Sequence, residues 1–225
     1  DQAVTINVTD VNEAPVFTSA TSASVAENTT EAYTAAASDD DLTSPTYAIV
    51  GGVDASLFTI DATSGVVSFI TPPDFEAAGD DDGDNDYEIT VRATDGVNNV
   101  DQNVTISVTD LNDNSPVFTS ATTSAVLEGT VTAYDADATD ADAGTALIYS
   151  ISGIDAGHFS INSSTGVVTF NASPDFETPL DDDGDNFYEI TVTASDGTNS
   201  TQQNVSIEVT DGNDNAPVFT SGGAG

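Results

Sequence analysis

Hydrophobic and polar residues alternate with a period of two in short segments along this chain. In the segment Tyr87–Ala93, Tyr, Ile, Val and Ala fall on one face, and Glu, Thr and Arg fall on the other. Successive side chains of a β-strand point to opposite faces, so this alternation predicts half-buried strands, and no convincing helical period appears. Further segments of this kind, between turn signals such as Ala62–Gly65, are Thr46–Val50, Phe58–Ile60, Val66–Phe69 and Val104–Val108.

The whole pattern repeats after 101 residues. The sequence Pro-Val-Phe-Thr-Ser starts at Pro15, at Pro116 and again at Pro217. About seven strands in about 100 residues predict an all-β fold of tandem seven-stranded Greek-key β-sandwiches with immunoglobulin-like architecture. The same spacing relates Glu27 to Glu128, Asp74–Glu76 to Asp175–Glu177, Asp80–Asn85 to Asp181–Asn186, and Asp95–Gly96 to Asp196–Gly197.

The repeat defines the expected domain boundaries. Two complete repeats are predicted, at residues 15–115 and 116–216. Asp1–Asp10 reads like Asp101–Asp110, so residues 1–14 are expected to be the last strand and linker of a preceding repeat. Residues 217–225 are expected to start a following one, and the chain is therefore interpreted as part of a longer array.

The charge of the chain restricts its partners. Asp and Glu total 39 against one Arg and no Lys, which gives a formal net charge of −38. Nucleic acids and anionic membranes require Lys and Arg to neutralise phosphates, so neither is an expected partner. No apolar run approaches the roughly 20 residues that span a bilayer, so membrane insertion is not expected. Without Cys there is neither a disulfide nor a thiolate site, and cations are the plausible ligands.

Asp and Asn residues are concentrated between the repeats. The linkers read DLNDNSP from Asp110 to Pro116 and DGNDNAP from Asp211 to Pro217. They offer carboxylate, amide and backbone oxygens, and calcium takes about 6–8 such ligands. Magnesium keeps several waters, and zinc favours His or Cys, of which this chain has one and none. The alternative interpretation is that these Asp and Asn residues only form turns.

The linker motif D-x-N-D-N-x-P, an early acidic residue, a D-x-E motif and an Asp-Gly after a long strand together resemble cadherin repeats. The resemblance covers essentially the whole chain. It implies calcium ions held between successive repeats. For the central junction it implies these ligands: Glu27, Asp74, Glu76, the carbonyl of Leu111, Asn112, Asp113, Asn114, Asp140, Asp142 and Asp196. For the half-present junctions it implies Asn12, Glu13, Asp39, Asp41 and Asp95 at one end, and Glu128, Asp175, Glu177, Asn213, Asp214 and Asn215 at the other.

Three features depart from the usual pattern of that family. The first linker, Asp10–Pro15, is one residue shorter and carries Glu13 where the others have an Asp-Asn pair. The D-x-E motif is Asp-Phe-Glu, where animal cadherins usually have Asp-Arg-Glu. The DDDGDN loops at Asp80–Asn85 and Asp181–Asn186 are larger and more acidic, which resembles bacterial cadherin-like repeats of surface adhesins. These loops are either solvated turns or extra calcium sites, because they share alternate Asp residues and a Gly with the EF-hand loop but lack its helices and fixed Glu.

An enzyme is not expected, and no catalytic residue is assigned. His158 replaces Leu57 of the other unit and Arg92 corresponds to Thr193, so both are predicted to be packing or surface residues. The expected function is a calcium-rigidified spacer or adhesive segment of a large extracellular adhesin or surface fibre. Its expected partners are calcium ions, neighbouring repeats, and other copies of the protein or surface glycans. The alternative is a calcium-dependent carbohydrate-binding module of a secreted protein; a polysaccharide hydrolase ranks last, because no aromatic-lined cleft is visible in the pattern.

Overall fold

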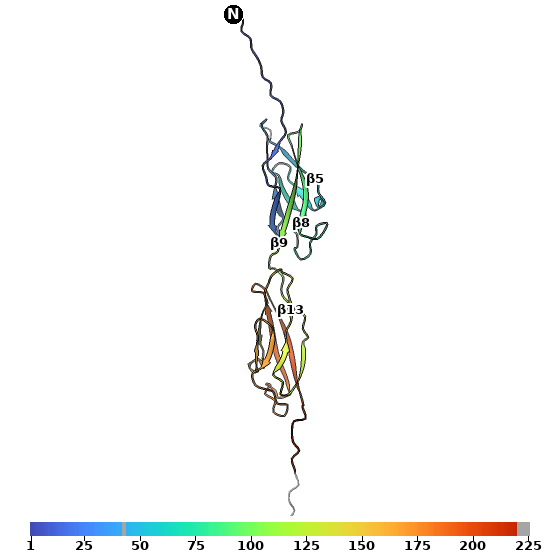
Figure 1. Cartoon of the computed structure of the whole chain (residues 1–225), viewed down its shortest axis with the longest axis vertical. Coiled ribbons are helices and arrows are strands. Elements are labelled where there is room, and N and C mark those ends of the chain that lie inside the picture. The colour runs from blue at the N-terminus through green and yellow to red at the C-terminus, as the bar shows by residue number, and fades with distance from the viewer. Residues whose placement is uncertain (42–43, 220–225) are drawn as a thin grey trace, which may run out of the picture. The chain divides into compact units, whose positions relative to one another are not determined.

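The computed structural model describes residues 1–41 and 44–219. The chain divides into two compact units, Asp1–Leu111 and Asn112–Gly225, and each is a β-sandwich (Figure 1). Part of the predicted start of a third repeat, residues 220–225, lies outside the described residues.

The two units contain the same elements in the same order. The described residues of the first unit form β1 (Val16–Phe17), β2 (Ser22–Ala26), β3 (Glu31–Thr34), β4 (Ala37–Ser38), β5 (Thr46–Gly51), the 3-10 turn η1 (Ala55–Leu57), β6 (Phe58–Ile60), β7 (Val66–Phe69), β8 (Asp86–Thr94) and β9 (Asn99–Thr109). Those of the second unit form β10 (Val117–Phe118), β11 (Thr123–Leu127), β12 (Thr132–Asp135), β13 (Ala138–Thr139), β14 (Ile148–Ser152), η2 (Ala156–His158), β15 (Phe159–Ile161), β16 (Val167–Phe170), β17 (Phe187–Ser195) and β18 (Ser200–Thr210).

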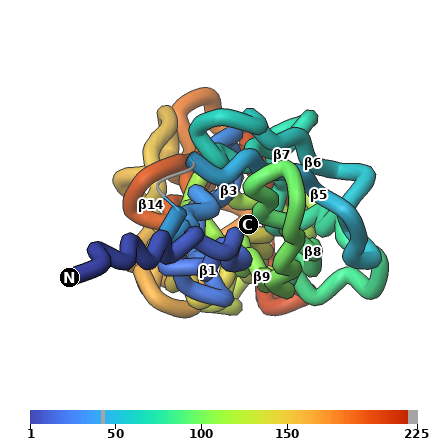
Figure 2. Tube along the Cα trace, turned by 90° about the horizontal axis from the view of Figure 1, so that it is seen from above, coloured from blue at the N-terminus to red at the C-terminus, as the bar shows by residue number. Residues whose placement is uncertain are grey.

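Within the described residues, each sandwich is built from a four-stranded and a three-stranded sheet. In the first unit the orders are β2-β9-β8-β5 and β3-β7-β6, and in the second they are β11-β18-β17-β14 and β12-β16-β15. In Figure 2, β6 and β7 lie on one side of the first unit and β8 and β9 on the other. The predicted seven strands per unit are therefore confirmed, with two additional short strands, β1 and β4 or β10 and β13, that pair with each other.

The alternating strands supply the core, as their sequence pattern predicts. Tyr87, Ile89, Val91 and Ala93 of β8 are buried, whereas the intervening residues are at least partly exposed. The ring of Tyr87 packs edge-on against two phenylalanines of the facing sheet, and Phe159, Phe170 and Tyr188 repeat this arrangement in the second unit. These aromatic contacts join the two sheets of each sandwich.

His158 and Arg92, which were not expected to be catalytic, make packing and surface contacts. The imidazole of His158 packs edge-on against Tyr188, with ring centroids 5.9 Å apart. Arg92 forms a surface ion pair with Asp101 at 2.7 Å. Both are therefore packing or surface residues, as predicted.

We expect Gly166→Ala to destabilise the second unit by about 3 kcal/mol. Gly166 has φ of +76°, and a Cβ at this position would collide with the carbonyl oxygen of Ala136. Gly144→Ala is the matched control, because Gly144 has φ of +77° and open space around the added methyl group. The control should lower the free energy of unfolding by only about 1 kcal/mol, which is the cost of placing a non-glycine residue in the left-handed region. Chemical denaturation in the presence of a chelator measures both, and equal losses would show that the Ala136 contact is unimportant.

Candidate metal centres

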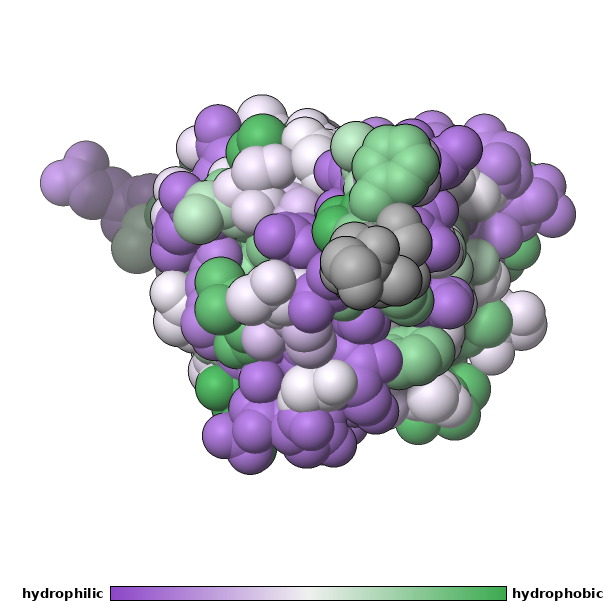
Figure 3. Space-filling view, turned by 90° about the horizontal axis from the view of Figure 1, so that it is seen from below, coloured by the Kyte–Doolittle hydropathy of each residue, from purple (hydrophilic) through white to green (hydrophobic). Residues whose placement is uncertain are grey.

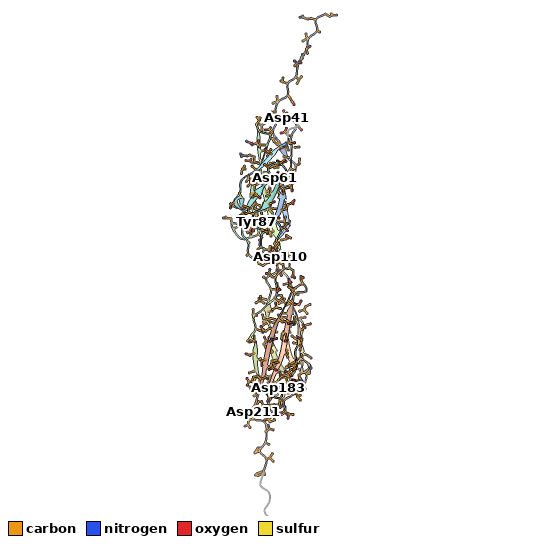
Figure 4. All side chains as sticks on the ribbon, turned by 180° about the vertical axis from the view of Figure 1, so that it is seen from behind. Asp41, Asp61, Tyr87, Asp110, Asp183 and Asp211 are labelled. Carbon is orange, nitrogen blue, oxygen red and sulfur yellow. The ribbon has the colours of Figure 1, made fainter. Side chains whose placement is uncertain are left out.

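Acidic side chains gather at both ends of each unit. Asp41 and Asp110 lie at opposite ends of the first unit (Figure 4). We call the group where the chain enters a unit its N-terminal cluster, and the group where the chain leaves its C-terminal cluster. The clusters collect residues from loops that are distant in sequence, because the strands run the length of the sandwich.

The C-terminal cluster of the first unit consists of Glu27, Asp74 and Glu76. One carboxylate oxygen from each lies within 4.8 Å of the others. Glu27 follows β2 and is only 2% exposed. Its Oε2 accepts a hydrogen bond from Phe75 N at 2.8 Å, and its Oε1 accepts one from Leu111 N at 2.9 Å. The buried carboxylate thus connects the Asp-Phe-Glu motif to the first residue after Asp110.

The C-terminal cluster of the second unit, Glu128, Glu177 and Asp211, has the same construction. Glu128 accepts hydrogen bonds from Phe176 N at 2.8 Å and from Gly212 N at 2.6 Å. These two bonds lower the pKa of Glu128. The backbone N–H of Glu177 favours its own charged form, but burial and the charges of Glu128 and Asp211 raise the pKa of Glu177 overall. The carboxylates are therefore crowded, and a cation would relieve their repulsion.

The other predicted residues of that end lie on the surface, and three of them line a hollow next to Glu128. Asp175 is exposed, and its Oδ1 accepts a hydrogen bond from Glu177 N at 3.1 Å. Asp214 N donates to the carbonyl of Gly212 at 2.7 Å. Asn213 and Asn215 are also exposed. The structure therefore brings Glu128 and Glu177 together, and it places Asp175, Asn213 and Asp214 around the same hollow as Glu128.

The N-terminal cluster of the second unit includes part of the linker. Asp142 is 4% exposed and accepts hydrogen bonds from Asn114 N at 3.0 Å and from Asn114 Nδ2 at 2.9 Å. Asn114 Nδ2 also donates to Asp113 Oδ1 at 3.1 Å. Asp142 N donates to Asp140 Oδ1 at 3.0 Å. A short acidic loop after β13 therefore holds the linker residue Asn114 from two directions.

Asp196 completes this cluster from the turn after β17. Its Oδ1 accepts hydrogen bonds from Thr198 N and Asn199 N, both at 2.6 Å. Asn199 Nδ2 donates to Asn114 O at 2.8 Å and to Asn112 Oδ1 at 3.3 Å. The turn and the linker are thus joined by direct hydrogen bonds.

Two oxygens of this cluster point to a cation. Asp140 Oδ2 and Asp196 Oδ2 are shielded from solvent and have no hydrogen-bond partner among the described residues. Burial opposes the ionisation of Asp196, but the N–H groups of Asn199 and Thr198 lower its pKa overall. A buried charged oxygen without a partner is costly unless a cation compensates it. The donor set therefore fits a calcium ion, which takes carboxylate and carbonyl oxygens.

The N-terminal cluster of the first unit shows the register of the shorter linker. Glu13 N donates to Asp41 Oδ2 at 2.7 Å, as Asn114 N does to Asp142. Glu13 therefore occupies the position of Asn114. Two further features repeat those of the second unit: Asp41 N donates to Asp39 Oδ1 at 2.9 Å, and Asp39 Oδ2 is buried without a hydrogen-bond partner among the described residues. Asp95 differs from Asp196, because its Oδ2 accepts a hydrogen bond from Asn12 Nδ2 at 2.7 Å.

Sequence reasoning missed several residues of these sites. Asn98 and Asn199 hold the linkers in both units, and the signal for them was the recurring Asp-Gly-x-Asn sequence. Asp10 joins Glu13 and Asp41, and Asp211 joins Glu128 and Glu177, in groups whose oxygens lie within 4.8 Å of one another. Both are the first residues of the linkers, immediately after strand-like sequences.

Two comparisons establish what the chain is similar to. A family model described as the cadherin domain matches residues 21–111 and 117–210. The chain is 36% identical over 191 residues to human "Protocadherin Fat 1", a match that covers 79% of the chain and 4% of that protein. It is 34% identical over 248 aligned positions to human "Protocadherin Fat 4", covering 99% of the chain and 5% of that protein. The chain thus spans a small fraction of the length of these relatives.

Solved structures show the same fold. Human Protocadherin-24 EC1-2 superimposes with a TM-score of 0.72 at 25% identity, covering 90% of the chain and 100% of that structure. Mouse Cadherin-23 EC22-24 gives a TM-score of 0.73 at 26% identity, and the match covers 91% of the chain and 68% of that structure.

The fold and the acidic ends define tandem adhesion-type β-sandwich repeats. The chain belongs to the cadherin family, because the family model matches most of its length. Its relatives are extracellular or cell-surface proteins, and this is the class in which the repeats belong. Among the described residues, no helix has the length and apolar character needed to cross a bilayer. The bacterial surface-adhesin resemblance stays a prediction.

Glu27→Ala should lower the stability of the first unit in a chelator by about 1–3 kcal/mol. The substitution leaves the N–H groups of Phe75 and Leu111 without their acceptor. Glu31→Ala is the control, since Glu31 is an exposed glutamate of β3 in the same unit. Urea denaturation with EDTA measures both variants, and an equal effect would contradict the bridging role of Glu27.

Proposed function

We propose that this chain is a calcium-rigidified spacer or adhesive segment of a large extracellular adhesin or surface fibre. One observation carries the proposal: buried carboxylate oxygens of the N-terminal clusters, at Asp39, Asp140 and Asp196, have no hydrogen-bond partner among the described residues. The family supports an adhesive extracellular segment, and these oxygens support a cation as part of it.

The chemistry of the clusters favours calcium over other metals. Their donors are carboxylate, amide and carbonyl oxygens, which are hard ligands. Zinc favours nitrogen or sulfur donors, and the one His of the chain, His158, packs against Tyr188 instead. Magnesium requires near-octahedral geometry and keeps several waters, which suits a crowded multidentate cluster less well.

The linker provides the mechanism of rigidity. Leu111 N is hydrogen-bonded to Glu27 of the first unit, whereas Asn112 and Asn114 are hydrogen-bonded to Asn199 of the second. Leu111 and Asn112 are covalent neighbours, so consecutive residues belong to different donor sets. An ion ligated by both sets would therefore restrain the linker, and its binding free energy would become conformational stability.

The proposed ligands of this junction are those implied by the family resemblance. From the first unit and the linker they are Glu27, Asp74, Glu76, the carbonyl of Leu111, Asn112, Asp113 and Asn114; from the second unit they are Asp140, Asp142 and Asp196. The end clusters around Asp41 and Glu128 would bind calcium more weakly, because each contains the donors of one repeat alone. Neighbouring repeats of a longer chain would complete them.

Adhesion to other copies is part of this proposal, and glycan binding is less well supported. One similar solved structure, of Protocadherin gammaB7, is described as a cis-dimer, with a TM-score of 0.64 and 25% identity.

On the coloured part of the face seen in Figure 3, hydrophilic residues are interspersed with separate hydrophobic ones. Aromatic residues such as Tyr87 and Tyr188 are buried in the cores, where they cannot stack on a sugar. A glycan array with and without calcium should therefore show no selective binding.

Asp140→Asn should weaken calcium binding by about tenfold. The variant keeps an oxygen that can accept the Asp142 N–H bond, but it removes the charge at the unpaired Oδ2. Asp135→Asn is the control, because Asp135 is an exposed aspartate of the same unit. Calorimetric titration of calcium into chelator-stripped protein measures the affinity. Small-angle scattering before and after the titration measures the distribution of shapes.

Saturable binding of several ions with a narrower shape distribution would support the proposal. Each site at tenfold its Kd should add about 1.4 kcal/mol of stability. Binding that leaves the shape distribution unchanged would contradict calcium-dependent rigidity. If Asp135→Asn weakened calcium binding as much as Asp140→Asn, the effect of Asp140→Asn would be explained by the loss of net charge alone.

A further inference from the structure

The proposed function does not use the DDDGDN loops, Asp80–Asn85 and Asp181–Asn186. The first lies between β7 and β8, and the second lies at the same place between β16 and β17. Asp183, in the second loop, is seen toward the same end of its unit as Asp211 in Figure 4. The two loops are separate in sequence from every residue assigned to the end clusters.

The first loop brings three carboxylates to one point. One oxygen each from Asp80, Asp82 and Asp84 lies within 4.8 Å of the others. The loop turns back on itself through Gly83, with φ of +77°, and Asn85, with φ of +66°. The alternate residues of the loop therefore converge, as the first three ligands of an EF-hand loop do.

A second observation, independent of the clustering, concerns the most buried member. Asp80 Oδ2 accepts a hydrogen bond from Asp84 N at 2.9 Å. Asp80 Oδ1 is shielded from solvent and has no hydrogen-bond partner among the described residues. Turn formation accounts for the hydrogen bond to Oδ2, but it gives the negative charge at Oδ1 no partner. Burial opposes the ionisation of Asp80, yet the N–H groups of the loop, with Asp84 foremost, lower its pKa overall.

The second loop has a similar construction in different surroundings. Asp181 is 7% exposed and accepts hydrogen bonds from Asp185 N at 2.8 Å and from Asn186 N at 3.3 Å, so both of its oxygens have partners, unlike those of Asp80. Asn186 has φ of +68°, like Asn85. The neighbouring positions differ, because Leu180 and Phe187 replace Gly79 and Asp86. The loop geometry is therefore set by the acidic sequence itself.

A buried aspartate fixes the start of each loop. Asp54 accepts hydrogen bonds from Asp81 N at 2.9 Å and from Glu88 N at 2.8 Å. Asp155, which is 1% exposed, makes the equivalent bonds to Asp182 N and Glu189 N. The carboxylates are thus presented from an ordered framework, which reduces the entropy lost when an ion binds.

The three carboxylates of the first loop lie close enough to repel one another in the absence of an ion. A divalent cation among them would reverse this repulsion.

We propose that the DDDGDN loop of the first unit binds one calcium ion of its own through Asp80, Asp82 and Asp84. The identical loop sequence extends the proposal to Asp181, Asp183 and Asp185 in the second unit. Each site is contained within one repeat and does not require a neighbouring one. Asn85 Nδ2 donates to Phe75 O at 2.9 Å, and Asn186 Nδ2 donates to Phe176 O at 3.0 Å. An ion in the loop would therefore also order the Asp-Phe-Glu motif of the C-terminal cluster.

The test combines two matched double variants of the full chain. Asp82→Asn with Asp183→Asn removes one exposed cluster carboxylate from each loop. Asp81→Asn with Asp182→Asn makes the same charge change in the same loops, outside the Asp80/Asp82/Asp84 cluster and its counterpart. The amide resonances of Gly83 and Gly184 are followed by NMR as calcium chloride, and separately magnesium chloride, is added to chelator-stripped protein.

Calcium should shift both glycine resonances saturably in the unmodified chain and in the Asp81/Asp182 variant. The Asp82/Asp183 variant should require about tenfold more calcium to reach half of the full shift. Asp140→Asn should leave these shifts unchanged, which separates the loop sites from the proposed junction. The absence of a saturable shift, or equal weakening in both double variants, would overturn the proposal. A magnesium response as strong as that to calcium would overturn the assignment to calcium.

Discussion

The structure depends on how a chain with almost no cationic side chains accommodates buried carboxylates. It has 39 acidic residues and one Arg, and that Arg pairs with Asp101 on the surface. The buried carboxylates of Glu27 and Asp142 are therefore held by backbone and amide N–H groups. Each such bond ties a loop to another segment, so the acidic residues organise the ends of the sandwich as well as charging them.

Backbone donors alone do not satisfy all of the carboxylate oxygens. At Asp140 and Asp196 one oxygen is used by the loop and the other is buried without a hydrogen-bond partner among the described residues. Asp80 shows the same division in the loop between β7 and β8. The loops are thus shaped by hydrogen bonds that need no ion, while their remaining oxygens are the ligands that we propose for one. This division explains how a site can be ordered before the metal binds.

Much of the fold could be predicted from the sequence, because alternation directly reports which side of a strand is buried. Phe58–Ile60 and Val66–Phe69 match β6 and β7, and Tyr87, Ile89 and Val91 form the core as expected. The register of Glu13 and the roles of Asn98 and Asp54 were not predicted. They depend on hydrogen bonds between loops far apart in the chain, and periodicity carries no information about those contacts. The candidate ligands came from the repeat spacing and the family resemblance. The hydrogen bonds from Glu27 to Phe75 N and Leu111 N became visible only in three dimensions.

The parallel pairing of β2 with β9 has a mechanical consequence. Val25 lies opposite Val108 in this pair, and Val126 lies opposite Val209 in the corresponding pair of β11 and β18. A force that pulls the start of a unit away from its end would slide these parallel strands past each other. Their hydrogen bonds would be loaded together in shear instead of being opened one after another. Each sandwich therefore has the strand geometry of a module that resists extension, which suits a segment under tension.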